Sequence, residues 1–427
     1  MGSSQLLTRI RLSVMMFLEF GLWAAWYVPI AGYMNGTLKF SGAQIGWVMA
    51  CTAIAAMISP LLVGFVADRF FATERVLSVL HLIGGLCLLL ASTQTAFLPL
   101  FALLMINALC FMPTLALVNS LAFRNIDDPD KFSYIMVWAT IGWIVAVTVV
   151  GQLLGGATEK NFFFLAGGGA IAMALYSLSL PHTPPKGAEA GGDVLGLSAL
   201  KLLARPSFLV FALCAFLISI PLSFYFVWIV PFLTETKAPG DPTTLTSISQ
   251  YSEIVVMFLL PWFIPRIGLK KVLVIGMAAW AARYLLFSLG LFPLTVLGLL
   301  LHGFCYVFVF VAAFIYVEKV APKELSASAQ SFLAFLMWGL GMFIGSKMAG
   351  YAGDMYPLGE GHQWVPIWLW PAMLAAIVCV LFLLGGRDVK PEEESKKAEA
   401  SQPGEEGEGG SEQPETQSET EAEGSEQ

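Results

Sequence analysis

Two polar side chains lie close together in a stretch, Ser247–Lys271, that is otherwise apolar enough to cross a membrane as a helix. Glu253 is 13 residues from Arg266, near the end of this stretch, so it would lie roughly 20 Å deep. Gln250, one turn earlier, falls on the same helical face. A carboxylate at that depth is costly unless it is paired, protonated or facing water. We therefore expect this face to line a cavity, where Glu253 accepts a proton or a ligand hydroxyl and Gln250 binds polar groups. The alternative is a structural hydrogen bond between helices.

Arg283 is the natural counter-charge for Glu253. It lies 12 residues after Lys271 in the next apolar stretch, so it would reach a similar depth on an antiparallel helix. A direct pair would favour the ionised carboxylate, whereas an apolar cavity would favour the neutral form, and this competition would suit a proton switch. The alternative is that Arg283 binds backbone carbonyls and has a structural role.

A second acid interrupts the first apolar stretch, Ile10–Met34. Glu19 shares a helical face with Trp23 and Trp26. It is eight residues from Arg11, which corresponds to roughly 12 Å along a helix. Glu19 is therefore either a second proton carrier or half of a structural ion pair near the end of its helix.

Two further helical faces combine polar and aromatic side chains. One carries Thr140 and Trp143, and the other carries His302 and Tyr306. Aromatic rings can stack on a planar base, although aromatic stripes in membrane helices more often serve packing. His302 could titrate near neutral pH or form a structural hydrogen bond, and we interpret His81 as structural.

These residues must be held by membrane helices. The chain has 427 residues, of which 57% are hydrophobic and 12% charged, whereas soluble domains have about 25% charged residues. Apolar segments long enough to span a bilayer recur twelve times, in two sets of six. We therefore predict an all-α integral membrane protein. Its predicted parts are an N-terminal half at residues 1–181, a linker with a short amphipathic helix at 182–206, a C-terminal half at 207–386 and a disordered acidic tail at 387–427.

The basic residues predict the orientation. With the N-terminus inside, eighteen Lys and Arg residues fall in cytoplasmic segments and four in external ones. Because cytoplasmic loops are enriched in basic residues, we expect both termini in the cytoplasm and the chain in the cell (inner or plasma) membrane.

The chain lacks the usual motifs of enzymes. The six cysteines lie inside apolar stretches, and none is spaced as a metal pair or disulfide framework. There is no HExxH motif, nucleophile elbow or phosphate loop. We therefore expect no enzymatic activity, no metal and no cofactor.

The turn GFVADRF resembles the Gly-x-x-x-Asp-Arg loop between the second and third helices of the major facilitator superfamily. Gly64, Asp68 and Arg69 match this motif. The resemblance implies twelve helices in two pseudo-symmetric halves that rock around a central site. It also implies that Asp68 and Arg69 tie helix ends together in one of the two gate states.

More specific segments resemble the nucleoside:proton symporter family of that superfamily. They are EFGLWAAWYVP (Glu19–Pro29), ATIGW (Ala139–Trp143), SQYSE (Ser249–Glu253), AARYLLF (Ala281–Phe287) and YVEKVAP (Tyr316–Pro322). The resemblance covers Met16–Gly386 and implies import of a nucleoside-like solute with a proton as the coupling ion. We expect a monomer in a lipid bilayer with no nucleic-acid partner.

The central positions depart from that family in part. The pattern retains Thr140, Trp143, Gln250 and Glu253. Met136 and Val307 stand where the family commonly has an arginine and an aspartate, and Ser223 and Phe226 stand where it often has amides. Such a site would form fewer charge-assisted bonds. The solute could thus be a modified nucleoside, or the protein could be a facilitator or antiporter of a less polar solute. The two-half pattern argues against a channel or receptor.

Overall fold

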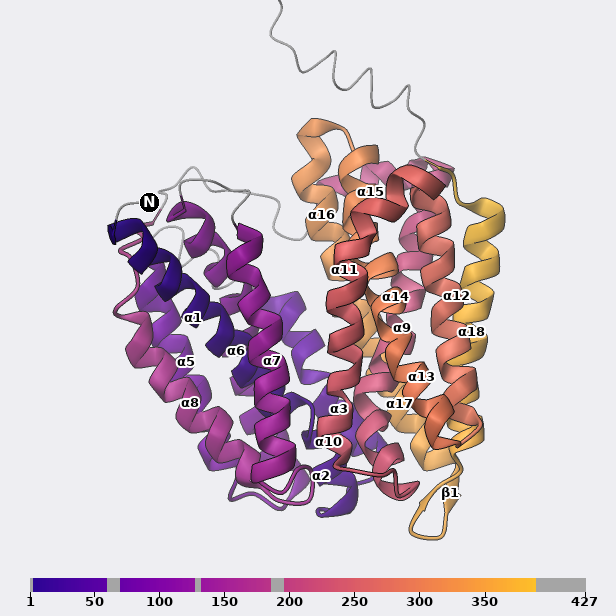
Figure 1. Cartoon of the computed structure of the whole chain (residues 1–427), viewed down its shortest axis with the longest axis horizontal. Coiled ribbons are helices and arrows are strands. Elements are labelled where there is room, and N and C mark those ends of the chain that lie inside the picture. Colours follow the sequence, from indigo (N-terminus) through magenta and orange to yellow (C-terminus); the bar gives the residue numbers. More distant parts are fainter. Residues whose placement is uncertain (1–2, 60–69, 127–131, 186–195, 389–427) are drawn as a thin grey trace, which may run out of the picture. The chain divides into compact units, whose positions relative to one another are not determined.

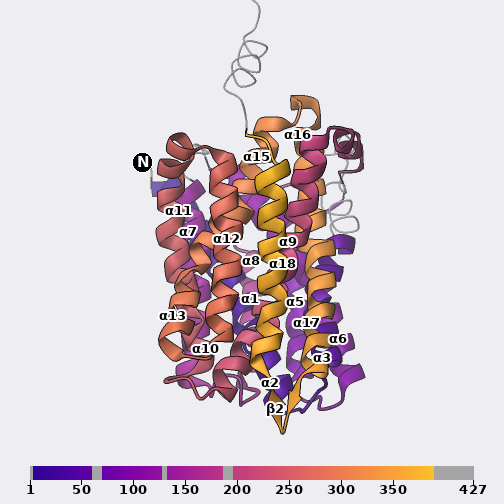
Figure 2. The same cartoon turned by 90° about the vertical axis from the view of Figure 1, so that its right-hand side faces the viewer.

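The computed structural model describes residues 3–59, 70–126, 132–185 and 196–388. Within these ranges the chain is almost entirely helical, apart from a short antiparallel hairpin of β1 (Pro357–Leu358) and β2 (Gly361–His362). The long helices run beside one another (Figures 1 and 2). Gly64, Asp68 and Arg69 of the predicted gating motif lie outside the described residues, as does the tail from residue 389.

The helices follow one another in the order predicted for two halves. The first set is α1 (Ser3–Tyr27), α2 (Ile30–Gly36), α3 (Gly42–Met49), α5 (Thr73–Ala91), α6 (Phe97–Arg124), α7 (Phe132–Leu153) and α8 (Asn161–Ser177). A 3-10 helix, η2 (Leu197–Ala204), occupies the region where the sequence predicts a short amphipathic helix.

The second set contains more interruptions. It comprises α9 (Pro206–Glu235), α10 (Pro242–Leu245), α11 (Ser247–Ile267), α12 (Leu269–Ser288), α13 (Phe292–Leu300), α14 (His302–Tyr306), η3 (Val307–Val311), α15 (Ala312–Val320), η4 (Lys323–Leu325), α16 (Ser326–Ala334), η5 (Phe335–Gly341), α17 (Met342–Met355) and α18 (Trp364–Gly385).

The predicted number of spans agrees with these helices. Among the described residues, eleven helical segments are long and apolar enough to cross a membrane, and α8 is a shorter apolar helix of 17 residues. At about 1.5 Å per residue α8 is roughly 26 Å long, which approaches the ~30 Å hydrocarbon core of a bilayer. The twelve predicted spans therefore correspond to eleven long segments and one short one.

Two helices position the central residues of the C-terminal half. Most residues of α9 are buried, because it packs against α17 and α18 of its own half. α11 packs against α12, α13 and α14 of its own half and against α7 of the other half. Figure 1 shows α12 and α14 beside α11.

Single residues decide where some helices end. Pro29 stands between α1 and α2 as the N-cap of α2. Gly268, with φ of +83°, separates α11 from α12, a backbone conformation that glycine adopts without steric cost. α11 therefore ends at Ile267, near Arg266 in the predicted basic turn, and Lys270 and Lys271 belong to the start of α12.

Two segments of the C-terminal half, η3 and η5, are π-helical. Such segments are rare in helices and frequently occur at functional sites. η3 directly follows α14, the short helix that carries His302 and Tyr306.

The two halves meet through α3 and α17. A Cβ atom on Gly42 would lie 2.2 Å from the carbonyl oxygen of Gly350, and one on Gly46 would lie 2.6 Å from that of Ser346. The backbones therefore touch directly, which only small residues permit. The Asp354 carboxylate accepts hydrogen bonds from the backbone N–H groups of Gly42 at 2.6 Å and of Ala43 at 2.7 Å.

Other contacts between the halves lie near the same helix ends. The Asn35 amide donates to Glu235 Oε1 at 3.0 Å, and the Gln152 amide donates to the Thr244 hydroxyl at 3.0 Å. We call this set of contacts, together with those of α3 and α17, the seam. Its residues adjoin the loops that follow α2, α7, α9 and α17.

The six cysteines are free thiols, and each is buried or half-buried. Their side chains fill space between packed helices, as the sequence predicts.

Candidate functional site

The face of α11 predicted to line a cavity carries two unlike polar groups. The Glu253 side chain is 20% exposed, so it is the more accessible of the two. Gln250 is buried, and its carbonyl oxygen Oε1 has no hydrogen-bond partner among the described residues. A buried acceptor without a partner is costly, so Gln250 is suited to a ligand that donates a hydrogen bond.

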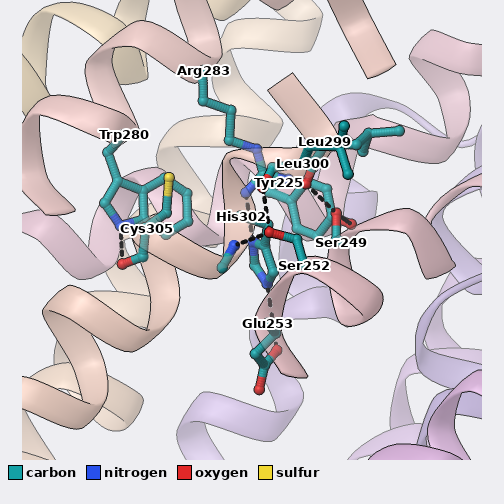
Figure 3. A network of polar contacts seen from close by, with 11 residues as sticks. Tyr225, Ser249, Ser252, Glu253, Trp280, Arg283, Leu299, Leu300, His302 and Cys305 are labelled. Atoms are coloured by element: carbon teal, nitrogen blue, oxygen red, sulfur yellow. Dashed lines mark hydrogen bonds and ion pairs between the residues drawn. The ribbon is translucent and has the colours of Figure 1, made fainter. Parts of the chain in front are cut away.

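Arg283, His302 and Glu253 form a row across three helices (Figure 3). Arg283 Nη1 lies 2.6 Å from His302 Nδ1, and His302 Nε2 lies 3.9 Å from Glu253 Oε2. The direct contact between Glu253 and Arg283 considered from the sequence is therefore wrong for this structure, because the imidazole lies between the two charged groups.

The guanidinium of Arg283 is held mainly by aromatic rings. Its side chain is fully buried, and Cζ lies 4.0 Å from the centre of the Tyr225 ring. Such stacking favours the cation. Two of its nitrogens, Nε and Nη2, have no hydrogen-bond partner within the described ranges. Within the described chain, these two nitrogens therefore do not bind the backbone carbonyls that the sequence suggested as alternative partners.

Hydrogen bonds fix the helices around this row. The Tyr225 hydroxyl on α9 donates to Ser249 on α11 at 3.1 Å. The Ser252 hydroxyl donates to the Leu300 carbonyl and accepts from the Gly303 N–H at 3.2 Å. A Cβ on Gly303 would lie 2.4 Å from the Ser252 carbonyl oxygen. This close approach of α14 to α11 brings His302 towards Glu253.

Aromatic rings connect the predicted residues of both halves. Tyr27 on α1 contacts Phe226 on α9, with ring centres 5.2 Å apart. On the other side, His302 stacks on Tyr225 and on Tyr306 at 5.3 and 5.7 Å. His302 and Tyr306 therefore share a face, as predicted.

The remaining aromatic position belongs to the N-terminal half. Trp143 on α7 packs edge-on against Trp23 on α1, with ring centres 5.5 Å apart. Thr140, one turn earlier on α7, is half-buried. Tyr225 and Tyr27 were missed from the sequence, where each is one more aromatic residue in an apolar helix.

Ser223 differs from the other predicted contacts. Its buried hydroxyl donates to the Met342 carbonyl at 3.0 Å, and Gly345 of α17 allows this close approach. This bond connects α9 to α17, so we leave Ser223 out of the solute site proposed below.

Glu19 lies in a separate cluster of the N-terminal half. Its side chain is fully buried, His81 Nε2 lies 2.8 Å from Oε2, and the Thr114 hydroxyl lies 2.5 Å from Oε1. The cluster connects α1, α5 and α6. Sequence reasoning treated Glu19 and His81 separately, because residues 62 positions apart share no periodic signal.

Within the described part of the chain, no group of three or more His, Cys, Asp or Glu side chains could hold a metal ion. Carboxylate, imidazole and amide groups of the kind gathered here can exchange protons and hydrogen bonds with a small polar molecule.

Comparison with known proteins identifies the family. The sequence pattern described as "Nucleoside H+ symporter" matches residues 6–390. The chain belongs to this nucleoside H+ symporter family. A relative in Escherichia coli K12, named "Putative nucleoside transporter YegT", is 39% identical over 89% of this chain and 94% of its own length. The xanthosine permease of the same organism is 31% identical over 88% of this chain and 95% of its own length.

Solved structures of this symporter family and beyond support the fold. The crystal structure of nucleoside transporter NupG has a TM-score of 0.82, with 29% identity over 88% of this chain and 98% of that chain. A bacterial homologue of the lysosomal transporter Spinster matches with a TM-score of 0.71 at 16% identity over 92% of this chain and 99% of that chain, which concerns the fold alone. This nucleoside H+ symporter family member is a multi-pass membrane transporter with the major facilitator fold, and it is not an enzyme.

Proposed function

We propose that this transporter imports nucleosides, or closely related solutes, together with protons. Family membership supports the proposal, and one structural observation carries it. The Arg283–His302–Glu253 row ends at a partly exposed carboxylate, and on the same helix Gln250 has a buried carbonyl with no hydrogen-bond partner among the described residues. An ionisable group and a free hydrogen-bonding group thus share one helix at membrane depth, where ionisable residues usually serve function.

The solute would meet both polar and aromatic groups. Gln250 would accept a hydrogen bond from a base N–H or ribose hydroxyl, and Glu253 would accept one from another hydroxyl. The rings of Trp143, Phe226 and Tyr306 would contact the faces of the base. Thr140 would add a hydroxyl from the N-terminal half.

The proton would bind at Glu253. A protonated carboxyl carries one O–H donor and keeps an acceptor oxygen, so Glu253 can still hydrogen-bond a solute and the two can bind together. Release on the other side would follow when the halves change their contacts. With the orientation expected from basic residues, both termini would lie in the cytoplasm and the seam at the external side.

A second candidate is a facilitator or antiporter of a less polar solute. Val307 is fully buried and Met136 half-buried, so these positions bring no charge to the site. Dependence of uptake on a proton gradient separates this candidate from a proton symporter.

The test is uptake of labelled uridine, adenosine and xanthosine into proteoliposomes, with and without an inward proton gradient. For the wild type we expect saturable uptake that the gradient drives. For Glu253→Gln we expect gradient-driven uptake to fall by at least about tenfold, because the amide cannot exchange a proton. Glu159→Gln, which removes an exposed carboxylate from the loop before α8, is the matched control and should resemble the wild type.

Gradient-independent uptake by the wild type would contradict symport and favour the facilitator. Absence of nucleoside uptake in a folded preparation would overturn the proposal that the solute is a nucleoside. The search for the actual solute would then begin with the side chains of Met136, Phe226 and Val307.

A further inference from the structure

We propose that His302 remains neutral and acts as a positioning residue that links Arg283 to Glu253. It accepts a hydrogen bond from Arg283 and directs its own ring N–H towards Glu253, so that the carboxylate is stabilised from the side of the cation. The inference rests on the proposed proton symport at Glu253. It assigns His302 a defined tautomer and excludes it as the group that carries the proton.

The contact with Arg283 defines the tautomer. A guanidinium has only hydrogen-bond donors, so His302 Nδ1, 2.6 Å from Nη1, must accept. The hydrogen of the neutral ring is then on Nε2. Nε2 is the atom that faces Glu253 Oε2. Arg283 thus orients the imidazole so that it presents a donor to the carboxylate.

The burial of Arg283 explains why this orientation matters. The guanidinium is fully buried, and two of its nitrogens have no acceptor within the described chain. A buried cation without an anion is strongly disfavoured, so it will attract a nearby carboxylate. In the observed arrangement Glu253 is the anion that faces Arg283, and His302 lies between the two side chains.

The other titratable groups around the row are few. They are Tyr225 on α9, Tyr284 on α12, and Cys305 and Tyr306 on α14. α7 and α13, which also pack against α11, bring no charged side chain. Arg283 and Glu253 are therefore the two groups whose charges His302 connects.

The distance between His302 and Glu253 leaves room for two states. The separation of 3.9 Å is about 1 Å longer than a hydrogen bond. An ionised Glu253 would move towards Nε2–H and shorten this gap. A protonated Glu253 would lose the attraction and remain free to bind solute. Only Glu253 gains or loses a proton in this cycle, while His302 keeps one ring hydrogen and Arg283 keeps its charge.

Substitution of His302 tests the role. In His302→Gln, the amide oxygen can accept from Arg283 and the amide N–H can point towards Glu253, but the side chain cannot be protonated. We expect gradient-driven uptake to stay within about threefold of wild type. In His302→Leu, which has neither group, we expect a loss of at least about tenfold, since the charge of Arg283 no longer reaches Glu253. Solute exchange at equal pH should persist in both variants, which shows that they fold.

Two outcomes would overturn the proposal. If His302→Gln loses gradient-driven uptake as fully as His302→Leu while exchange persists, His302 itself carries the proton. If His302→Leu remains coupled, no charge is transmitted through this residue.

A spectroscopic measurement separates this inference from the identity of the solute. The chain has four histidines, so nitrogen NMR of isotope-labelled histidine can be assigned by substitution. His302 should remain neutral with its hydrogen on Nε2 between about pH 6 and about pH 8, and Arg283→Gln should weaken this tautomer preference. A protonated ring, or a hydrogen on Nδ1, would contradict the proposal even if the protein transported no nucleoside.

Discussion

Glu19 and Glu253 are both acids within membrane helices, but their surroundings differ. Glu19 is fully buried and has close partners on both oxygens, His81 and Thr114. Glu253 is 20% exposed, and its nearest basic partner is 3.9 Å away. A group that exchanges protons during transport must reach water or solute, so the geometry favours Glu253 for this role and a structural role for Glu19.

Glu19→Gln should therefore leave gradient-driven uptake within about threefold of wild type, because glutamine can both accept from His81 and donate to Thr114. Glu19→Ala should lower the free energy of unfolding by about 2 kcal/mol, since the buried His81 Nε2 loses its partner Glu19 and Thr114 keeps only the Phe111 carbonyl. Transport and thermal unfolding measured on both variants check this. Loss of gradient-driven uptake in Glu19→Gln with intact exchange would instead make Glu19 a proton carrier.

Much of the residue-level site is visible in the sequence. Glu253 and Gln250 stand out because polar groups are rare in such helices, and the shared face of His302 and Tyr306 follows from helical spacing. The position of His302 between Arg283 and Glu253 is not predictable in this way. It depends on how closely α14 approaches α11, which is a property of the packed helices.

At the scale of elements, the approach of α14 to α11 depends on Gly303. The absent side chain allows the Gly303 N–H to reach Ser252 and sets the position of the following turn. The π-helical segment η3 begins directly after this turn. The close contact between Gly303 and Ser252 thus contributes directly to the geometry of the row.

Gly303→Ala should disturb this arrangement, because its Cβ would lie 2.4 Å from a backbone oxygen of α11. Overpacking of this kind typically costs about 1–3 kcal/mol, and we also expect gradient-driven uptake to fall by at least about tenfold as His302 moves away from Glu253. The control is Gly168→Ala on α8, where an added Cβ meets nothing within 4 Å. Thermal unfolding and uptake of the two variants should differ clearly, and equal behaviour would show that the approach of α14 is unimportant.

The sequence predicts these elements better than their interruptions. Hydropathy finds the spans because each needs about 20 apolar residues. The division of one span into α13, α14, η3 and α15 arises from local contacts. Ser223 is a similar case, since only the structure reveals its bond to Met342.

For the whole molecule, the seam identifies the state of the transporter. Its contacts adjoin the loops that follow α2, α7, α9 and α17. In the orientation that we propose, with the N-terminus in the cytoplasm, these loops would face outside and the seam would close the external side. A transporter that alternates its access must break these contacts in its other state.

Asp354 is the residue of the seam whose loss should favour that other state. Its carboxylate accepts two backbone N–H bonds at the start of α3, where the helix dipole also favours negative charge. Asp354→Ala should shift the equilibrium by about 1–2 kcal/mol, or roughly tenfold. The control is Glu360→Gln, since the pair of Glu360 with Lys39 is 3.9 Å long and exposed, and exposed pairs contribute little. Spin-label distances between the halves measure the shift, and equal distance distributions in both variants would contradict a closing role for Asp354.

The burial of the native cysteines offers a practical way to follow this motion. All six thiols are buried or half-buried within helices, so a maleimide or nitroxide reagent will react first with a thiol introduced on the surface. Lys160 and Lys237 are exposed in loops of opposite halves, and a pair of cysteines at these positions would carry the labels. Labels at these two positions would therefore follow the conformational cycle in real time, and the native cysteines would not have to be removed first.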